Sequence, residues 1–224
     1  MSSLRSRSAP ASLSEPVQAF VRRAYERLAA APAEGKPDPA VVPLRGDHEL
    51  APELAHLATN SVPLPAAVLI PVVARAEPTV LFTQRTAALP VHAGQIAFPG
   101  GKMHPEDSDP LATALREAEE EIGLARRFAD PIGYLETYLS RTGFHIVPVV
   151  ALIAPAFELS LNRAEVDEVF EVPLGFLMAP ENHARHSREL NGVRRSFYAM
   201  PYGERYIWGV TAGILRNLYE RLYG

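Results

Sequence analysis

The chain of 224 residues contains no cysteine, and this absence excludes two kinds of chemistry. Neither a disulfide framework nor a thiol nucleophile can be built from it. A chain without disulfides suits a reducing compartment, and the cytoplasm is therefore the predicted location.

Long apolar runs and an excess of positive charge are missing as well. No apolar run approaches the roughly 18 residues that a membrane-spanning helix needs, so no membrane partner is expected. The net charge of −4 lacks the basic footprint of a nucleic-acid-binding protein. The remaining composition, 47% apolar, is that of one domain with a substantial core and an appendage.

Proline is unevenly distributed, with nine of the 21 prolines before Ala66. Apolar residues recur at helical spacing within 15–31, and residues 32–65 are typical of an extended, Pro-rich connection. We therefore predict that residues 1–65 form an N-terminal helix and a Pro-rich extension, and that residues 66–224 form the main domain. A homodimer contact through the extension is a possibility left open at this stage.

The main domain alternates between β-rich runs and helical patterns. The helical patterns predict an acidic helix that ends near residue 122, a helical turn at 174–178 and a closing helix at 208–222. The β-rich runs predict strands at 67–74, 79–84, 94–98, 132–139, 145–153, 170–172 and 196–200. A mixed sheet between helices, an α/β/α sandwich, is the architecture that this order favours.

Residues 98–124 are the most informative part of the chain, because a glycine turn leads there into an acidic helix. Ser108 or Asp109 fits the N-cap, and Pro110 fits the first helical position, where its missing N–H costs little. Gly123 is a suitable C-terminal stop. The spacing therefore predicts a helix over 110–122.

Glu117, Glu120 and Glu121 stand at i, i+3 and i+4 and are expected to share a helix face. Carboxylates gathered in this way repel one another, and a divalent cation with hard oxygen ligands relieves the repulsion. An all-oxygen site of this kind, with the Gly101 carbonyl as a further ligand, favours Mg²⁺ or Mn²⁺. Arg116, four residues before Glu120, can hold a carboxylate in position.

A solvated, Glu-rich surface helix is the alternative to a metal site. That alternative does not account for Gly100-Gly101 ahead of the helix, for the capping residues, or for the fixed position of Arg116 beside Glu117. Metal-assisted chemistry on a phosphate substrate is the better interpretation.

The same residues resemble the Nudix box, G-x5-E-x7-R-E-U-x-E-E-x-G-U, in which U is aliphatic. The matching positions are Gly101 and Arg116-Glu117-Ala118-Glu119-Glu120-Glu121-Ile122-Gly123-Leu124. The first half departs from the pattern, because Gly101 to Arg116 is one residue longer and Asp107 stands in place of the first Glu. This longer spacing with an Asp is similar to that of the coenzyme A branch of the family.

An upstream block supports the resemblance to that branch. Leu81-Phe-Thr-Gln-Arg-Thr-Ala87, followed by His92-Ala-Gly-Gln-Ile-Ala-Phe-Pro-Gly-Gly101, resembles the L-L-T-x-R-S and G-x3-F-P-G-G signature of coenzyme A pyrophosphatases. Residues 165–174 and 208–212 also look like this branch. The resemblance implies a Nudix-type α/β/α sandwich and a metal-dependent diphosphatase. Its implied products are 3′,5′-ADP and 4′-phosphopantetheine, or the acylated form of the latter.

The remaining site residues are assigned by role. Glu120 is one candidate general base, and Nudix enzymes that use a loop carboxylate point to Glu165, with Glu168 next. Arg116 is counted among the catalytic residues because it holds a carboxylate. Guanidinium forks suit phosphate oxygens, so Arg85 and Arg141 are candidate substrate contacts, and His92 joins them from the upstream block.

Two other functions stay open at the level of the sequence. One is a Nudix hydrolase of a different nucleoside diphosphate derivative, such as ADP-ribose or NADH. The other is a Nudix-fold binding module without catalysis, against which the intact Glu117, Glu120 and Glu121 argue. In each case the expected partner is a small molecule.

Overall fold

A computed structural model describes residues 12–32, 43, 45–50, 64–89, 92–190 and 193–224. The predicted Pro-rich connection lies largely outside these residues. The described part contains four α-helices, which are α1 (Glu15–Arg27), α3 (Pro110–Ile122), α4 (Leu174–Leu177) and α5 (Val210–Tyr223). It also contains three short 3-10 helices, η2 (Asp47–Glu49), η4 (Arg126–Phe128) and η5 (Pro180–Asn182).

The strands of the described residues form two sheets. The larger sheet contains β1 (Arg45–Gly46), β2 (Leu64–Val73), β3 (Thr79–Arg85), β4 (Ile96–Ala97), β5 (Gly100–Lys102), β6 (Ala129–Tyr134), β7 (Tyr138–Leu139), β8 (Phe144–Ile153) and β9 (Val166–Pro173). The smaller sheet contains β10 (Ala184–Leu190), β11 (Val193–Tyr202) and β12 (Arg205–Trp208).

The parallel pair β2 and β8 forms the centre of the larger sheet. The pairing runs without interruption from Leu64 opposite Phe144 to Val73 opposite Ile153. Both strands are nearly continuous apolar runs, as expected for strands that are covered on both faces. The other strands extend this pair, mostly in antiparallel fashion.

The outer strands bring distant parts of the chain together. β5 pairs with β2, β9 and β4 pair with β3, and β6 and β7 pair with β8, all antiparallel. The two-residue β1 lies parallel to β7. The predicted hairpin of β2 and β3 is paired only next to its turn, at Val72 with Val80 and Val73 with Thr79. Beyond the turn the two strands diverge, and this opening admits β5 and β4.

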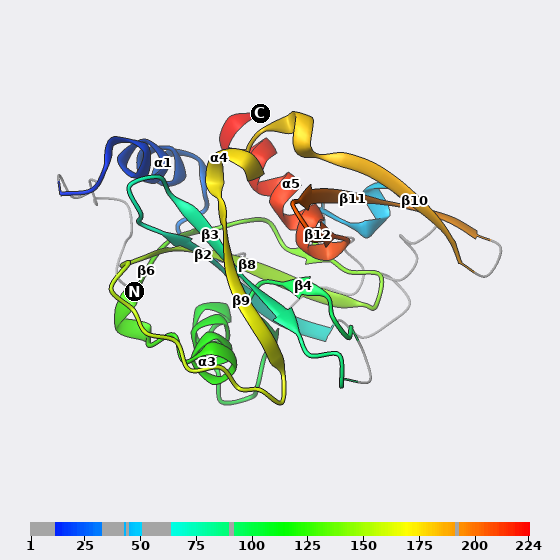
Figure 1. Cartoon of the computed structure of the whole chain (residues 1–224), viewed down its shortest axis with the longest axis horizontal. Coiled ribbons are helices and arrows are strands. Elements are labelled where there is room, and N and C mark those ends of the chain that lie inside the picture. The colour runs from blue at the N-terminus through cyan, green and yellow to red at the C-terminus, as the bar shows by residue number, and fades with distance from the viewer. Residues whose placement is uncertain (1–11, 33–42, 44, 51–63, 90–91, 191–192) are drawn as a thin grey trace.

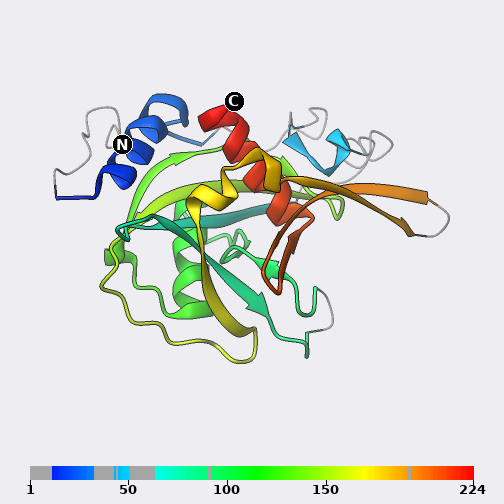
Figure 2. The same ribbon diagram turned by 45° about the horizontal axis from the view of Figure 1, so that its top comes forward.

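Helices cover both faces of the larger sheet, so the predicted α/β/α sandwich with a mixed sheet is confirmed (Figure 1). α3 lies on one face, while α1, α4 and α5 lie on the other (Figures 1 and 2). The smaller sheet projects beside α5, away from α3.

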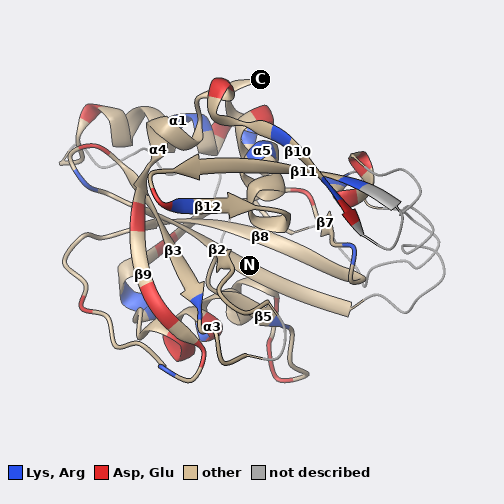
Figure 3. Cartoon of the chain, turned by 45° about the vertical axis from the view of Figure 1, so that its right-hand side comes forward, with Lys and Arg blue, Asp and Glu red and all other residues tan. Residues whose placement is uncertain are grey.

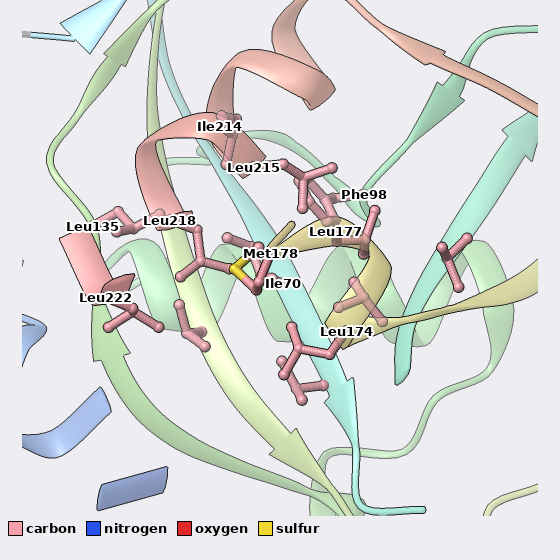
Figure 4. Packing of buried hydrophobic residues seen from close by; sticks show 14 of the residues in the cluster. Ile70, Phe98, Leu135, Leu174, Leu177, Met178, Ile214, Leu215, Leu218 and Leu222 are labelled. Atoms are coloured by element: carbon pink, nitrogen blue, oxygen red, sulfur yellow. The ribbon is translucent and has the colours of Figure 1, made fainter. Parts of the chain in front are cut away.

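Each face has its own hydrophobic core. Ala114, Ala118 and Ile122 of α3 are buried against residues such as Leu69 and Val149 of the sheet. On the opposite face, α5 packs Ile214, Leu215, Leu218 and Leu222 toward Ile70, Leu174 and Met178 (Figure 4). α1 adds Val17, Phe20, Val21 and Ala24 to this second core.

The ends of α3 match the sequence prediction in detail. Asp109 is the N-cap, and its carboxylate accepts a hydrogen bond of 2.8 Å from the backbone N–H of Ala112. Gly123 ends the helix in the left-handed region, with φ of 69°. The acidic helix is therefore fixed at both ends by residues that the sequence identifies.

Several predicted boundaries were wrong. Residues 132–139 form two strands rather than one, and the predicted strand at 170–172 is the longer β9. Trp208 ends β12 and does not begin the closing helix. β10 and β12 carry little apolar signal, because β10 is an exposed edge strand of sequence ARHSREL and β12 has only four residues.

No helix in the described ranges is both long and apolar enough to cross a membrane.

Gly123→Ala should destabilise the fold by about 1–2 kcal/mol, because a left-handed φ strains any residue with a Cβ. The added Cβ would also lie 2.8 Å from the backbone nitrogen of Ser160. Urea unfolding measures the loss. Gly175→Ala is the matched control, because a Cβ on Gly175 in α4 meets nothing within 4 Å. Equal stability of the two variants would contradict the strain argument.

Candidate active site

The glycine turn brings the backbone against the carboxylates of α3. A Cβ on Gly101 would lie 2.5 Å from Oε1 of Glu117, so only glycine leaves room for that carboxylate. The N–H of Gly100 donates a hydrogen bond of 3.4 Å to Oε2 of Glu121. The pairing of β5 with β2 therefore sets the distance between the turn and the helix.

Arg116 links the carboxylates to one another. Its Nε and Nη2 donate to the two oxygens of Asp107 at 3.0 and 2.9 Å, which is a bidentate ion pair. Its Nη1 donates to Glu117 at 2.8 Å and to Glu120 at 3.0 Å. Arg116 thus holds carboxylates in position, as the sequence predicts, but it holds three of them.

Asp107 is the anchor of Arg116. Its side chain is 7% exposed, and Oδ2 also accepts hydrogen bonds from the His104 N–H at 2.9 Å and the Thr113 hydroxyl at 2.8 Å. The hydrogen bonds from Arg116 hold the pKa of Asp107 well below its usual range. The Asp that replaces the first Glu of the motif is therefore ionised at neutral pH and orients the arginine.

Glu121 occupies a different environment from Glu117 and Glu120. It is 3% exposed, and its only ion pair among the described residues is with Nη1 of Arg85, at 3.8 Å. Burial, followed by the charge of Glu117, raises the pKa of Glu121 to about 8, and the charge of Glu165 acts in the same direction. Glu117, Glu165 and Arg85 therefore all lie close enough to act on this one buried carboxyl group.

The three glutamates, which their spacing places on one side of the helix, differ in exposure. The side chains of Glu121, Glu117 and Glu120 are 4%, 14% and 56% exposed. In the part of the chain that the structure describes, no three His, Cys, Asp or Glu side chains form a ready-made cation site. Arg116 engages Oε1 of Glu117 and Oε2 of Glu120.

The donor set nevertheless fits a divalent cation. All the candidate ligands are hard oxygens, and a cation beside Glu117 and Glu121 would offset both the burial and the charge of Glu117 that raise the pKa of Glu121. The space that Gly101 leaves beside Glu117 would be filled by a Cβ on any other residue. Figure 3 shows acidic residues of α3 and β9 gathered near the end of β3, where a basic residue lies.

The two loop carboxylates proposed from the sequence differ in availability. Glu165 precedes β9 beside the end of β3, where the Thr86 N–H donates to its carbonyl at 2.9 Å and Asn162 Nδ2 donates to its carboxylate at 3.0 Å. Glu168 forms a two-pronged pair with Arg205 at 2.7 and 2.5 Å. Of these two carboxylates, Glu165 acts on Glu121 while Glu168 is paired with Arg205, so Glu168 is the weaker candidate.

A cleft of about 370 Å³ opens beside the glycine turn. Its lining includes Gly100, Gly101 and the three predicted substrate contacts, Arg85, His92 and Arg141. The imidazole Nδ1 of His92 lies 2.8 Å from Oε1 of Gln95, and the backbone N–H of Arg141 donates to Asp47 at 2.8 Å. The structure therefore brings together residues from four separate segments of the chain.

Other cleft residues were not identified from the sequence. Lys102 of β5, Arg195 and Phe197 of β11 and Trp208 of β12 all line it. Trp208 lies in a stretch that resembles the coenzyme A branch, but Lys102, Arg195 and Phe197 belong to no motif. The place of Arg195 and Phe197 in the cleft depends on how the smaller sheet packs against the larger one, which local sequence patterns do not report.

Glu121→Gln should stabilise the metal-free protein at pH 8, because it removes a buried carboxyl group whose pKa is raised by burial and by Glu117. Between the unfolded pKa, near 4.5, and the folded pKa, about 8, only the unfolded chain ionises, so wild-type stability falls as pH rises. The difference in unfolding midpoint should be small at pH 5 and grow toward pH 8. A gain of 1 kcal/mol corresponds to about 2–4 °C.

Thermal unfolding across this pH range, with and without Mn²⁺, measures the effect. Glu119→Gln is the control, since Glu119 lies on the same helix but is exposed. Mn²⁺ should raise the midpoint of the wild type more than that of Glu121→Gln. A pH-independent difference between wild type and variant would contradict the raised pKa.

Comparison with known proteins decides the family. A family model described as "NUDIX domain" matches residues 63–191. The chain belongs to the Nudix family. A Photorhabdus laumondii protein named "Uncharacterized Nudix hydrolase NudL" is 39% identical over 157 residues, which cover 70% of this chain and 84% of that protein. A Yersinia pestis protein of the same name is 40% identical over 159 residues, covering 70% and 79%.

Among solved structures, the NUDIX domain of Shewanella oneidensis NrtR, complexed with ADP ribose, is 17% identical and covers 72% of this chain and 90% of that chain. The TM-score between the two is 0.46. Membership of the family establishes the type of reaction. This Nudix protein is an enzyme that hydrolyses a pyrophosphate bond in a nucleoside diphosphate derivative, and Nudix hydrolases generally use divalent metal ions.

Proposed function

We propose that this Nudix hydrolase cleaves the pyrophosphate bond of coenzyme A and its derivatives, giving 3′,5′-ADP and 4′-phosphopantetheine or its acylated form. One observation carries the proposal. The upstream block that resembles coenzyme A pyrophosphatases contributes Arg85, His92 and Gln95 to the cleft beside the carboxylates of α3. Residues that distinguish the branch thus line the same cleft as Gly100 and Gly101, the turn against which Glu117 and Glu121 lie.

The charge of the cleft supports a substrate with several phosphates. Arg85, Lys102, Arg141 and Arg195 line it, whereas Asp47 is the one acidic lining residue among those described. Both oxygens of Asp47 accept hydrogen bonds, from the Tyr138 hydroxyl and from the Arg141 N–H, at 2.8 Å each. The protein as a whole carries a net charge of −4, so an anionic substrate is attracted to the cationic cleft and not to the surface in general.

We propose that Glu117, Glu120, Glu121 and the Gly101 carbonyl hold Mg²⁺ or Mn²⁺. When bound, the cations would neutralise pyrophosphate oxygens and lower the pKa of the attacking water. Arg116, itself held by Asp107, orients Glu117 and Glu120 by pairing with one oxygen of each, which leaves the second oxygen of each carboxylate for a cation. Arg85, which lines the cleft and faces Glu121, is proposed to bind a phosphate oxygen beside the metal ligands.

Either Glu120 or Glu165 is proposed to take the proton from the attacking water. Glu120 is the more exposed of the two, and its Oε2 pairs with Arg116 at 3.0 Å. Glu165 is half-buried beside Glu121 and is held by Asn162. A general base contributes about 10²–10⁴-fold to a rate, so single substitutions can distinguish them.

Incubation of the protein with coenzyme A and Mn²⁺ should release 3′,5′-ADP, with ADP-ribose and NADH cleaved far more slowly. Separation of the products by chromatography measures the preference. Cleavage of ADP-ribose or NADH without any 3′,5′-ADP from coenzyme A would transfer the assignment to another Nudix substrate. Binding of these nucleotides without hydrolysis of any would instead indicate a non-catalytic module.

Glu120→Gln should lower kcat by about 100-fold or more with little change in thermal stability, because the side chain is exposed and its role is chemical. Glu119→Gln is the control, because the carboxylate of Glu119 is exposed and pairs with Arg126 on the surface at 3.4 Å. Glu165→Gln, assayed in parallel over pH, tests the other candidate base. Loss of the acidic limb of the pH–rate profile in one variant only would assign the base to that residue. Unchanged turnover in Glu120→Gln would overturn the metal-site mechanism.

A further inference from the structure

The cleft has a second wall that the proposed hydrolysis does not use. β11 and β12 of the smaller sheet form this wall, with Arg195, Phe197 and Trp208 in the lining. The rings of Phe197 and Trp208 lie 5.2 Å apart between centroids, tilted by 60°. A guanidinium next to two flat apolar rings suits one end of a nucleotide better than it suits the reacting diphosphate.

Arg195 has a buried hydrogen-bond donor without an acceptor among the described residues. This donor is the side-chain Nε. The residue opposite it across the strand pair is another arginine, Arg188 of β10, so its neighbour adds positive charge. A buried donor on a charged group costs free energy when it has no acceptor, and an anionic ligand would supply one.

Two other cationic cleft residues, Arg85 and Lys102, lie beside the carboxylates of α3. Arg85 faces Glu121 at 3.8 Å, although its Nε also finds no partner among the described residues. Lys102 follows the glycine turn, and its carbonyl accepts a hydrogen bond of 3.2 Å from Arg116. Arg195 belongs to a different sheet from both. The cleft thus offers one basic region beside α3 and another on the β11 wall.

We propose that Arg195 binds a phosphate of the substrate other than the two in the scissile bond, namely the 3′-phosphate of the adenosine end of coenzyme A. This inference rests on the proposed function. The planar guanidinium presents parallel N–H donors to phosphate oxygens, and the Phe197 and Trp208 rings provide apolar surface for the adjacent adenine. Arg195 is therefore a specificity residue that separates coenzyme A from nucleotides without a 3′-phosphate.

The test compares coenzyme A with dephospho-coenzyme A, which lacks only the 3′-phosphate. Arg195→Gln should lower kcat/KM for coenzyme A by about 10–100-fold, mainly through KM, and leave kcat/KM for dephospho-coenzyme A within about twofold. Arg195→Lys, which keeps the charge but not the fork, should recover part of the loss. Arg188→Gln is the matched control, an exposed arginine on the neighbouring strand. An equal loss on both substrates, or no loss on either, would overturn the inference.

A binding measurement separates this inference from the proposed function. Calorimetric titration with 3′,5′-ADP and with 5′-AMP should show wild type preferring 3′,5′-ADP, and Arg195→Gln should remove the preference without changing the affinity for 5′-AMP. If wild type fails to hydrolyse coenzyme A but shows this pattern, the proposed function fails and the phosphate site stands. If wild type hydrolyses coenzyme A and Arg195→Gln retains the preference, the phosphate site alone fails.

Discussion

The hydrogen bonds that Arg116 gives to Asp107, Glu117 and Glu120 are the interaction on which the rest of the site depends. They join the loop before α3 to the carboxylates on it, and Asp107 stays ionised because the same bonds depress its pKa. A network of this kind resolves like-charge repulsion for two of the glutamates. It does not reach the buried Glu121, whose pKa is raised by burial and by the charge of Glu117 even though Arg85 lies nearby.

The fold supports this network from below. The parallel pair of β2 and β8 is buried on both faces, and the short β5 docks on β2 with two glycines facing the helix. Only glycine at position 101 lets the carboxylate of Glu117 approach the backbone this closely. Packing of Ala114, Ala118 and Ile122 fixes the rotation of α3, so its polar side must meet the turn.

The parts of this arrangement that the sequence predicts are those with local causes. Asp109, Pro110 and Gly123 bound α3 by capping chemistry, which requires no knowledge of the rest of the fold. Spacing of i, i+3 and i+4 could not show that Glu121 is buried while Glu120 is exposed, because adjacent helical residues diverge by about 100°. The sequence did not identify Arg195 and Phe197 as cleft residues, because their position depends on how the two sheets pack. The neighbouring edge strand β10 is polar and lacks the alternation of apolar and polar residues by which strands are recognised.

The smaller sheet also has a consequence for how such an enzyme can diversify. The family match ends at residue 191, whereas β11 and β12 follow it along the chain and still form one wall of the cleft. The wall formed by β11 and β12 is thus encoded apart from the stretch that contains Glu117, Glu120 and Glu121. Substitutions in the later stretch can therefore reshape one side of the cleft without altering the acidic helix.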